Sequence, residues 1–212
     1  MKDGFIDNKI AEYTESFTSA EPDTVQNLVE ESEQSLEFTD MLCGRQVAMT
    51  LKMLIAISNA KRVLEIGTFS GYSALMMAES LPEDGELYTC ELNERYFEIS
   101  EKFFSKSPYN QIIKQVPGEA LNTIPKLEGY FDLVFLDADK INYPAYYRLI
   151  KEKTKPGSLL VVDNTLWGGE VINQETPKAE AVHRMNLMVR EDPDIEQVML
   201  PVRDGILIGR FL

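Results

Sequence analysis

The chain is poor in the residues on which many metal and nucleophile sites depend. Its 212 residues include one His, two Cys and one Trp. Cys43 and Cys90 are too few and too far apart for a CxxC metal site or a disulfide framework, so we expect a reducing compartment, the cytoplasm. A Ser-His-Asp hydrolase would have to use His183, and no GxSxG motif accompanies it. Zinc sites, disulfide scaffolds and serine hydrolysis are therefore not favoured.

Basic residues and long apolar runs are also scarce. The 21 Lys and Arg residues are outnumbered by 35 Asp and Glu residues, and the net charge is -14. Nucleic-acid binding rests on clustered Lys and Arg, so no nucleic-acid partner is expected. No apolar run approaches about 18 residues, and the N-terminus lacks the apolar core of a signal peptide, so no membrane partner is expected. A small-molecule partner fits this composition better.

Short apolar runs alternate with helical patterns from residue 61 onward, as is typical of βαβ units. The run LVFL at 133–136 has no polar alternation, which is expected of a parallel strand covered on both faces. Each step from strand to helix predicts a parallel, right-handed crossover. The predicted strands are 62–66, 86–92, 111–116, 133–136 and 158–162. The predicted helices are 45–59, 72–80, 93–106, 119–126, 143–153 and 178–190.

The two ends of the chain depart from this alternation. Residues 195–202 and 206–212 flank an Arg-Asp-Gly turn and predict a β-hairpin, which completes seven strands. Residues 5–40 predict two amphipathic helices that are broken at Glu21-Pro22. We therefore expect one α/β domain over 1–212, with an N-terminal helical cap at 1–40 and a core at 41–212.

A loop with two glycines follows the first predicted strand, in LEIGTFSGYS at 64–73. In an open α/β sheet this loop lines the ligand crevice, and Gly67 and Gly71 permit close backbone approach. The spacing is GxxxG and not GxGxxG, which weakens the case for a pyrophosphate ligand such as NAD. Glu91 ends the second strand, where a carboxylate can bind ribose hydroxyls. Each feature alone also fits an ordinary turn or strand end, but together they favour a nucleoside cofactor that need not carry phosphates.

Acidic and amide side chains follow two further predicted strands. Asp137 follows the fourth, and Asp163 and Asn164 follow the fifth. Three oxygen ligands without His or Cys suit Mg²⁺, Ca²⁺ or Mn²⁺ rather than Zn²⁺. The same residues also favour turns and helix caps, so either strand end alone fits that simpler role. Lys140 lies three residues beyond Asp137, where it is a candidate general base or an ordinary surface Lys.

Four segments resemble a known family: LEIGTFSGYS, GEAL at 118–121, FLDADKINY at 135–143 and DNTLWGG at 163–169. They are similar to the cation-dependent small-molecule O-methyltransferases, the caffeoyl-CoA O-methyltransferase-like group related to catechol O-methyltransferase. The resemblance implies a Rossmann-like class I methyltransferase fold, with a seven-stranded, mostly parallel sheet, an antiparallel last strand and helices on both faces. It also implies S-adenosylmethionine as cofactor, a divalent cation (Mg²⁺, or Ca²⁺ or Mn²⁺), a phenolic substrate and a homodimer.

The resemblance also assigns roles to individual residues. Lys140 is the implied catalytic base, and Trp167 is implied to flank an aromatic substrate. The implied metal ligands are Asp137, Asp163 and Asn164. The implied cofactor-binding residues are Cys43, Glu65, Gly67, Ser73, Glu91, Ala120, Asp137 and Asp139. Cys43 stands where the family commonly has a small hydroxyl residue.

Two other functions remain open at this point. A nicotinamide-dependent oxidoreductase could use the same fold, but it would be expected to have GxGxxG and a Tyr-x-x-x-Lys pair, and Tyr143 is followed four positions later by Tyr147. A non-catalytic cofactor-binding protein would have no use for Lys140 beside a cation. The acceptor stays open among a free catechol, a flavonoid and a CoA ester.

Overall fold

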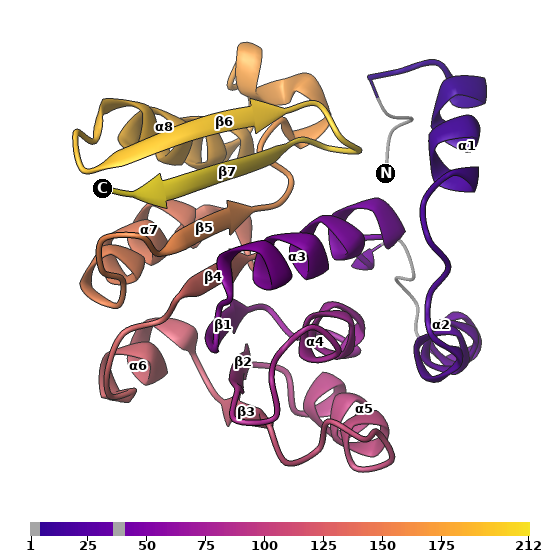
Figure 1. Cartoon of the computed structure of the whole chain (residues 1–212). Helices are drawn as coiled ribbons and strands as arrows, with labels where there is room; N and C mark the ends of the chain where they lie inside the picture. The colour runs from indigo at the N-terminus through magenta and orange to yellow at the C-terminus, as the bar shows by residue number, and fades with distance from the viewer. Residues whose placement is uncertain (1–4, 36–40) are drawn as a thin grey trace.

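The computed structural model describes residues 5–35 and 41–212, in which one mixed sheet lies between two layers of helices (Figure 1). The strand order is β3-β2-β1-β4-β5-β7-β6. Pairing is parallel from β3 to β5, and β7 is antiparallel to both of its neighbours. The strands are β1 Arg62–Ile66, β2 Glu86–Glu91, β3 Ile113–Pro117, β4 Leu133–Leu136, β5 Leu159–Val162, β6 Ile195–Leu200 and β7 Ile206–Phe211. The predicted seven-stranded sheet with an antiparallel last strand is confirmed.

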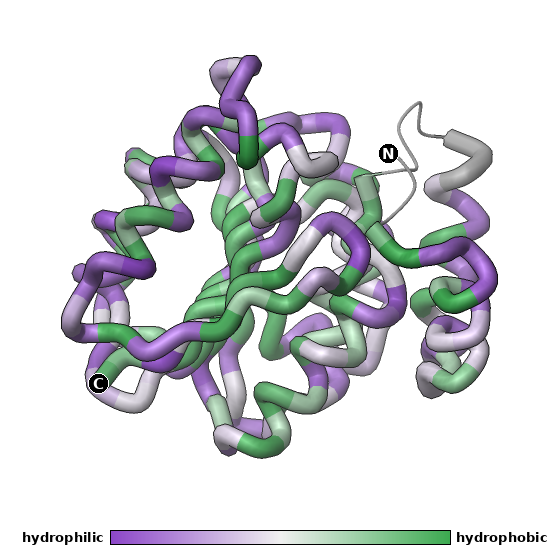
Figure 2. The backbone as a smooth tube through the Cα atoms, turned by 90° about the horizontal axis from the view of Figure 1, so that it is seen from above, coloured by the Kyte–Doolittle hydropathy of each residue, from purple (hydrophilic) through white to green (hydrophobic). Residues whose placement is uncertain are grey.

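Consecutive strand residues belong to different hydrophobic clusters, one on each face of the sheet. In β1, Val63 packs into the cluster that contains α3, α4 and α5, whereas Leu64 packs into the cluster that contains α6, α7 and α8. Figure 2 shows the hydrophobic strands gathered in the middle of the molecule. All four residues of β4 are buried because both faces are covered, which explains the absence of polar alternation. These helices are α3 Arg45–Ser58, α4 Tyr72–Ala78, α5 Glu94–Phe104, α6 Ala120–Thr123, α7 Tyr143–Glu152 and α8 Pro177–Glu191.

Some predicted boundaries shift for local reasons. The strand predicted at 111–116 begins at Ile113, because the N–H groups of Ile112 and Ile113 donate to the carbonyl of Tyr109 in a turn. The helix predicted at 119–126 is a short α-helix followed by the 3-10 helix η2, Ile124–Lys126, where Pro125 has no N–H to donate. Two further 3-10 helices, η3 Lys140–Asn142 and η4 Trp167–Ile172, were not predicted.

The N-terminal segment forms α1 Asn8–Ser16 and α2 Asp23–Ser35, with the predicted break at Glu21-Pro22 between them. The α2 helix enters the core through Val25 and Leu28, but α1 buries no residue. Polar contacts hold α1 on α3, among them an ion pair of 2.9 Å between Glu15 and Arg45. The parts of the predicted cap at 1–4 and 36–40 lie outside the described residues.

The chain reverses its direction of strand addition between β1 and β4. It adds β2 and β3 on one side of β1, then returns to place β4 on the other side. Ligands of open α/β sheets bind at the carboxyl ends of the strands at such a switch point. Within residues 5–35 and 41–212, no helix combines the length and apolarity needed to cross a bilayer.

Candidate active site

The ends of β1, β4 and β5 are aligned, so that the residues that follow them meet at one edge of the sheet. The N–H of Asp137 donates to the carbonyl of Ile66 at 3.0 Å, and the N–H of Asp163 donates to the carbonyl of Leu136 at 3.0 Å. A cavity of about 680 Å³ opens at this edge. Its walls come from all three strand ends, from β2 and from the loops beyond them.

Gly67 lets β1 and β4 end side by side. Its φ is +105°, in the region that favours glycine, and an added Cβ would lie 2.1 Å from the carbonyl oxygen of Asp137. The first glycine of the GxxxG motif is therefore required by the approach of two backbones. Because its backbone also lines the cavity, the same contact leaves a ligand direct access to the main chain.

A buried hydrogen-bond network lies beneath the cavity. The carboxyl group of Glu65 is fully buried and accepts hydrogen bonds of 2.5 Å from the hydroxyls of Ser73 and Thr89. Burial raises the pKa of Glu65 to about 8, while the two hydroxyls act in the opposite direction. Glu65 does not line the cavity, whereas Ser73 does. Glu65 thus ties β1 to β2 and to the start of α4.

Glu91 lies at the end of β2 and binds two backbone groups. Its carboxylate oxygens accept from the N–H groups of Phe69 and Asn93, each at 2.8 Å. Burial raises the pKa of Glu91, and these donors oppose the shift. Each carboxylate oxygen keeps a second lone pair for a ligand on the cavity side.

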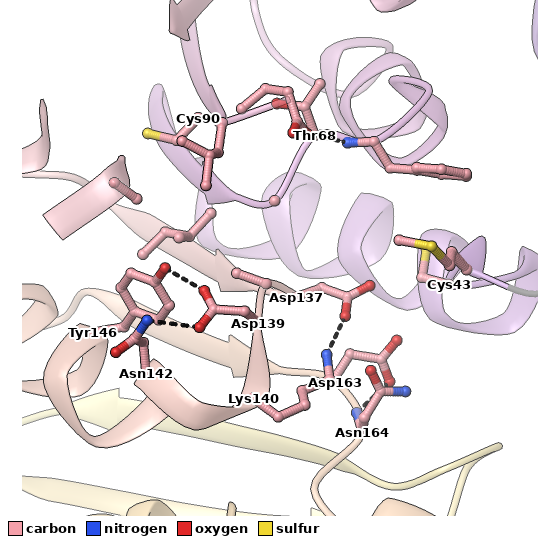
Figure 3. Close-up of a pocket in the computed structure, with 18 of the residues that line it drawn as sticks. Cys43, Thr68, Cys90, Asp137, Asp139, Lys140, Asn142, Tyr146, Asp163 and Asn164 are labelled. Carbon is pink, nitrogen blue, oxygen red and sulfur yellow. Dashed lines mark hydrogen bonds and ion pairs between the residues drawn. The ribbon is translucent and has the colours of Figure 1, made fainter. Parts of the chain in front are cut away.

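Asp139 follows β4 and lines the cavity, and Ala120 lines it too. It accepts hydrogen bonds from the hydroxyl of Tyr146 at 2.6 Å and from the amide of Asn142 at 2.7 Å. Figure 3 shows these two side chains beside Asp139, turned away from Asp163. The carboxylate of Asp139 is thus fixed at the cavity wall by groups that the sequence had not singled out.

Asp137, Asp163 and Asn164 point toward one another in Figure 3. The side chain of Asp163 is buried, and burial together with the charge of Asp137 raises the pKa of Asp163 to about 8. Asn164 has a φ of 56°, and its N–H donates to Asp163 at 2.8 Å. The described residues contain no metal-site cluster of three or more His, Cys, Asp or Glu, since this set has two carboxylates and one amide.

This set nevertheless fits a divalent cation. Two carboxylates share a buried corner in which the charge of one disfavours ionisation of the other, and a cation would remove that penalty. The available donors are oxygens, which Mg²⁺, Ca²⁺ and Mn²⁺ prefer. Asp137, Asp163 and Asn164 are therefore the residues that could hold such an ion.

Lys140 is held between the two strand ends. Its Nζ lies 2.8 Å from Oδ1 of Asp137 and donates to the hydroxyl of Tyr143 at 2.7 Å. The fully buried Tyr143 in turn donates to the carbonyl oxygen of Asp163 at 3.1 Å. The amine thus has a fixed position beside the acidic pair. Sequence reasoning missed Tyr143, although its position three residues after Lys140 on a helix start was a usable signal.

Cys43 and Trp167 line the part of the cavity around the acidic pair. Burial raises the pKa of the Cys43 thiol, and the charges of Asp163 and Asp137 add to the effect, so this thiol stays protonated. Nζ of Lys140, in η3, lies 5.9 Å from the centroid of the Trp167 ring, and Nζ of Lys178, in α8, lies 5.6 Å from it. Every residue predicted for the site lines the cavity except Glu65.

Comparison with known proteins decides the family. A family model described as O-methyltransferase matches residues 15–212. Caffeoyl-CoA O-methyltransferase 2 of Populus trichocarpa is 36% identical over 174 residues, which are 76% of this chain and 70% of that protein. The chain belongs to this O-methyltransferase family. The methyltransferase is therefore an enzyme, and neither the nicotinamide oxidoreductase nor the non-catalytic binder is supported.

Solved structures agree with this membership. The O-methyltransferase TomG of Streptomyces achromogenes, in complex with SAM, is 27% identical with a TM-score of 0.86, and the match covers 96% of both chains. The SAH-bound methyltransferase PaMTH1 of Podospora anserina is 27% identical with a TM-score of 0.90, covering 97% of this chain and 94% of that one. The predicted Rossmann-like methyltransferase fold is confirmed.

Proposed function

We propose that this methyltransferase transfers a methyl group from S-adenosylmethionine to a hydroxyl of a small catechol-like phenol, with the help of a divalent cation. The observation that carries the proposal is the convergence of Asp137, Asp163 and Lys140 at one corner of the switch-point cavity. TomG and PaMTH1 are described with SAM and SAH, and the Populus relative is named for a caffeoyl ester. These names agree with the donor and with the class of acceptor.

The cofactor half of the cavity suits a nucleoside. Glu91 offers two fixed oxygens to ribose hydroxyls, and Ala120 and Asp139 form the wall proposed for the adenine. Gly67 and Ser73 leave room for the amino-acid portion close to the backbone. When bound, S-adenosylmethionine supplies a methyl group on a positively charged sulfur.

The acceptor half would prepare the hydroxyl. A cation held by Asp137, Asp163 and Asn164 would lower the pKa of a bound hydroxyl and orient two vicinal oxygens. Lys140 takes the proton, because its amine is fixed beside Asp137 at the same corner. Tyr143 keeps that amine in place, and Trp167 lies against the acceptor ring.

A methyl-transfer assay with a catechol acceptor tests this function. Protein treated with EDTA should lose at least about 100-fold in rate and recover it when Mg²⁺ is restored. Binding of S-adenosylhomocysteine, measured by calorimetry, should be the same in both samples and serves as the control. Equal rates with and without the chelator would remove the cation from the mechanism.

We also propose a homodimer in a reducing, cytoplasmic setting. The α1 helix buries none of its residues and exposes Ile10 and Tyr13, and Phe17, the residue directly after it, is 75% exposed. These positions are spaced to form an apolar face that a second copy could cover. Sedimentation equilibrium should give twice the mass of the chain, and a monomer would contradict the dimer. The reducing setting is supported by Cys43 and Cys90, which are both free thiols.

A further inference from the structure

Arg203 has a backbone conformation that is unusual for its side chain. It is the first central residue of the turn between β6 and β7, which is closed by a 2.9 Å hydrogen bond from the N–H of Gly205 to the carbonyl of Val202. Its φ is 50°, in the left-handed region that glycine adopts at the lowest cost. Backbone strain of this kind is typical of residues whose side chains have a function.

The turn that carries Arg203 is fixed to the segment after β5. The N–H of Leu166 donates to the carbonyl of Asp204 at 2.9 Å, and the N–H of Gly168 donates to the carboxylate of Asp204 at 2.6 Å. These bonds join the turn to residues 163–168, which include two of the proposed metal ligands. The backbone of Arg203 therefore has a defined position relative to this wall of the cavity.

The guanidinium of Arg203 reaches from the turn to the segment that precedes α3. It donates to the carbonyl of Leu42 at 3.2 Å. It also lies against Gly44, whose φ is +81° and where an added Cβ would lie 1.8 Å from Nη1 and 2.5 Å from Cζ of Arg203. The contact thus depends on a left-handed backbone at one end and on the absence of a side chain at the other.

The segment held in this way, residues 41–44, forms a wall of the cavity. Met41, Leu42 and Cys43 line the cavity, as does Arg203. Leu42 and Cys43 also pack in the hydrophobic cluster that contains α3. Among the described residues, the bond from Arg203 to Leu42 is the one hydrogen bond that joins residues 41–44 to a part of the chain beyond α3.

Cys43 lies on the side of the cavity that holds the acidic pair. Figure 3 shows it toward Asp163 and away from Tyr146. The charge of Asp163 adds to the rise in the pKa of the Cys43 thiol, and the charge of Arg203 opposes that rise. Both charged groups are therefore close to the thiol, and residues 41–44 close the cavity beside the acidic pair.

We propose that Arg203 is a positioning residue that clasps residues 41–44 to the β6–β7 turn and so holds the cavity closed beside the acidic pair. The clasp joins two walls that are far apart in the sequence, the segment before α3 and the segment after β5. When the contact between Arg203 and Leu42 opens, Cys43 becomes exposed and the acceptor loses a wall. The effect on the acceptor rests on the proposed function, whereas the exposure of Cys43 does not.

Thiol labelling tests the clasp without any acceptor. The wild type and Arg203→Gly are treated with N-ethylmaleimide, and the labelled cysteine is located by peptide mass spectrometry. Cys43 should react about tenfold faster in Arg203→Gly, because loss of a charged hydrogen-bond donor favours the open wall. Loss of the positive charge alone would raise the pKa of the thiol and slow its reaction, so faster labelling reports opening. Cys90, which is 3% exposed, is the internal reference and should react at the same rate in both proteins.

Gln174→Gly is the matched control variant. Gln174 is exposed, has a φ of 56° and does not line the cavity. Both variants replace a long side chain at a left-handed position by glycine, so each should change Tm by less than about 3 °C. Arg203→Gly is therefore expected to fold, and it alone should expose Cys43.

Methyl transfer gives the second readout. With a catechol acceptor, Arg203→Gly should raise the KM for the acceptor about tenfold and leave kcat within about twofold, because the wall positions the acceptor and takes no part in proton transfer. Gln174→Gly should change neither constant.

The outcomes separate the clasp from the function. Equal labelling of Cys43 in the wild type and Arg203→Gly would overturn the clasp. Faster labelling of Cys43 and Cys90 together, or of Cys43 in Gln174→Gly as well, would also overturn it, because either result reports a general loss of stability. Faster labelling of Cys43 with an unchanged KM would overturn the positioning role. A wild type that methylates no catechol would contradict the proposed function instead, and the labelling rates would still decide the clasp.

Discussion

The two ends of the cavity are built in different ways. The end proposed for the cofactor rests on strand ends, a glycine backbone and the buried network of Glu65. The end proposed for the acceptor adds Trp167 from the 3-10 helix η4, Lys178 from the start of α8 and Arg203 from the β6–β7 turn. The first end is therefore part of the sheet itself, whereas the side chains of the second can change without changing the sheet. Lesions at the first should cost stability, and lesions at the second should cost turnover.

The largest effect is expected for Lys140→Met, which keeps the length of the side chain and removes the amine. Loss of a general base should lower kcat by about 10² to 10⁴. Affinity for S-adenosylhomocysteine should stay within about twofold, because Lys140 contacts Asp137 and Tyr143 on the acceptor side. Lys126→Met is the control. Unchanged turnover would show that another group accepts the proton.

Gly67→Ala should destabilise the fold at the other end of the cavity. Its Cβ would lie 2.1 Å from a backbone oxygen at a φ of +105°, so we expect a loss of about 3 kcal/mol in the free energy of unfolding. Gly157→Ala is a matched control, since Gly157 also has a positive φ, +91°, with nothing within 4 Å of its added Cβ. It should cost about 1 kcal/mol. Equal losses in urea unfolding would show that the backbone contact at Gly67 is relieved at no cost.

A smaller effect is expected for Tyr143→Phe, which releases the amine of Lys140 from one of its two partners. We expect kcat to fall about tenfold with little change in KM, because the base is displaced and the acceptor contacts remain. Tyr147→Phe also removes a buried hydroxyl, the one that donates to Asp192 at 2.7 Å, far from Lys140. It should lower stability alone. A similar loss of kcat in both variants would make the role of Tyr143 structural.

The smallest effect concerns the pH dependence of stability. The pKa of Glu65 is about 8 in the folded chain and 4.5 in its ordinary state, so between these values the folded protein keeps a proton that the unfolded chain releases. Its contribution to stability is therefore complete below about pH 4.5 and is lost as the pH rises toward 8. Between about pH 5 and about pH 8, the Tm of Glu65→Gln should fall by at least about 3 °C less than the Tm of the wild type. The exposed Glu128 gives the control Glu128→Gln, and equal slopes in all three proteins would refute the shift.

Sequence patterns predict the first end of the cavity well, for a physical reason. Strand periodicity places Gly67, Glu91 and Asp137 at strand ends, and parallel pairing then brings strand ends together. Side-chain direction is harder to infer. Glu65 belongs to the same motif as Gly67, yet it does not line the cavity, because its buried carboxyl group is bound by the hydroxyls of Ser73 and Thr89.

The acceptor end depends on contacts that no local pattern encodes. Lys178 and Arg203 reach the cavity from α8 and from the β6–β7 turn, and Trp167 and Arg203 have positive φ values of 46° and 50°. Tyr143 acquires its role through the carbonyl of Asp163, twenty residues away. Such long-range contacts follow from the packed structure and not from residue spacing.

Binding of Mn²⁺ tests the division of the cavity most directly. Electron paramagnetic resonance of free Mn²⁺ should show one ion bound by the wild type and none by Asp163→Asn, because that variant removes one of two carboxylates at the proposed cation corner. Calorimetry should give the two proteins the same affinity for S-adenosylhomocysteine. Undiminished Mn²⁺ binding in Asp163→Asn, or a parallel loss of cofactor affinity, would contradict the account.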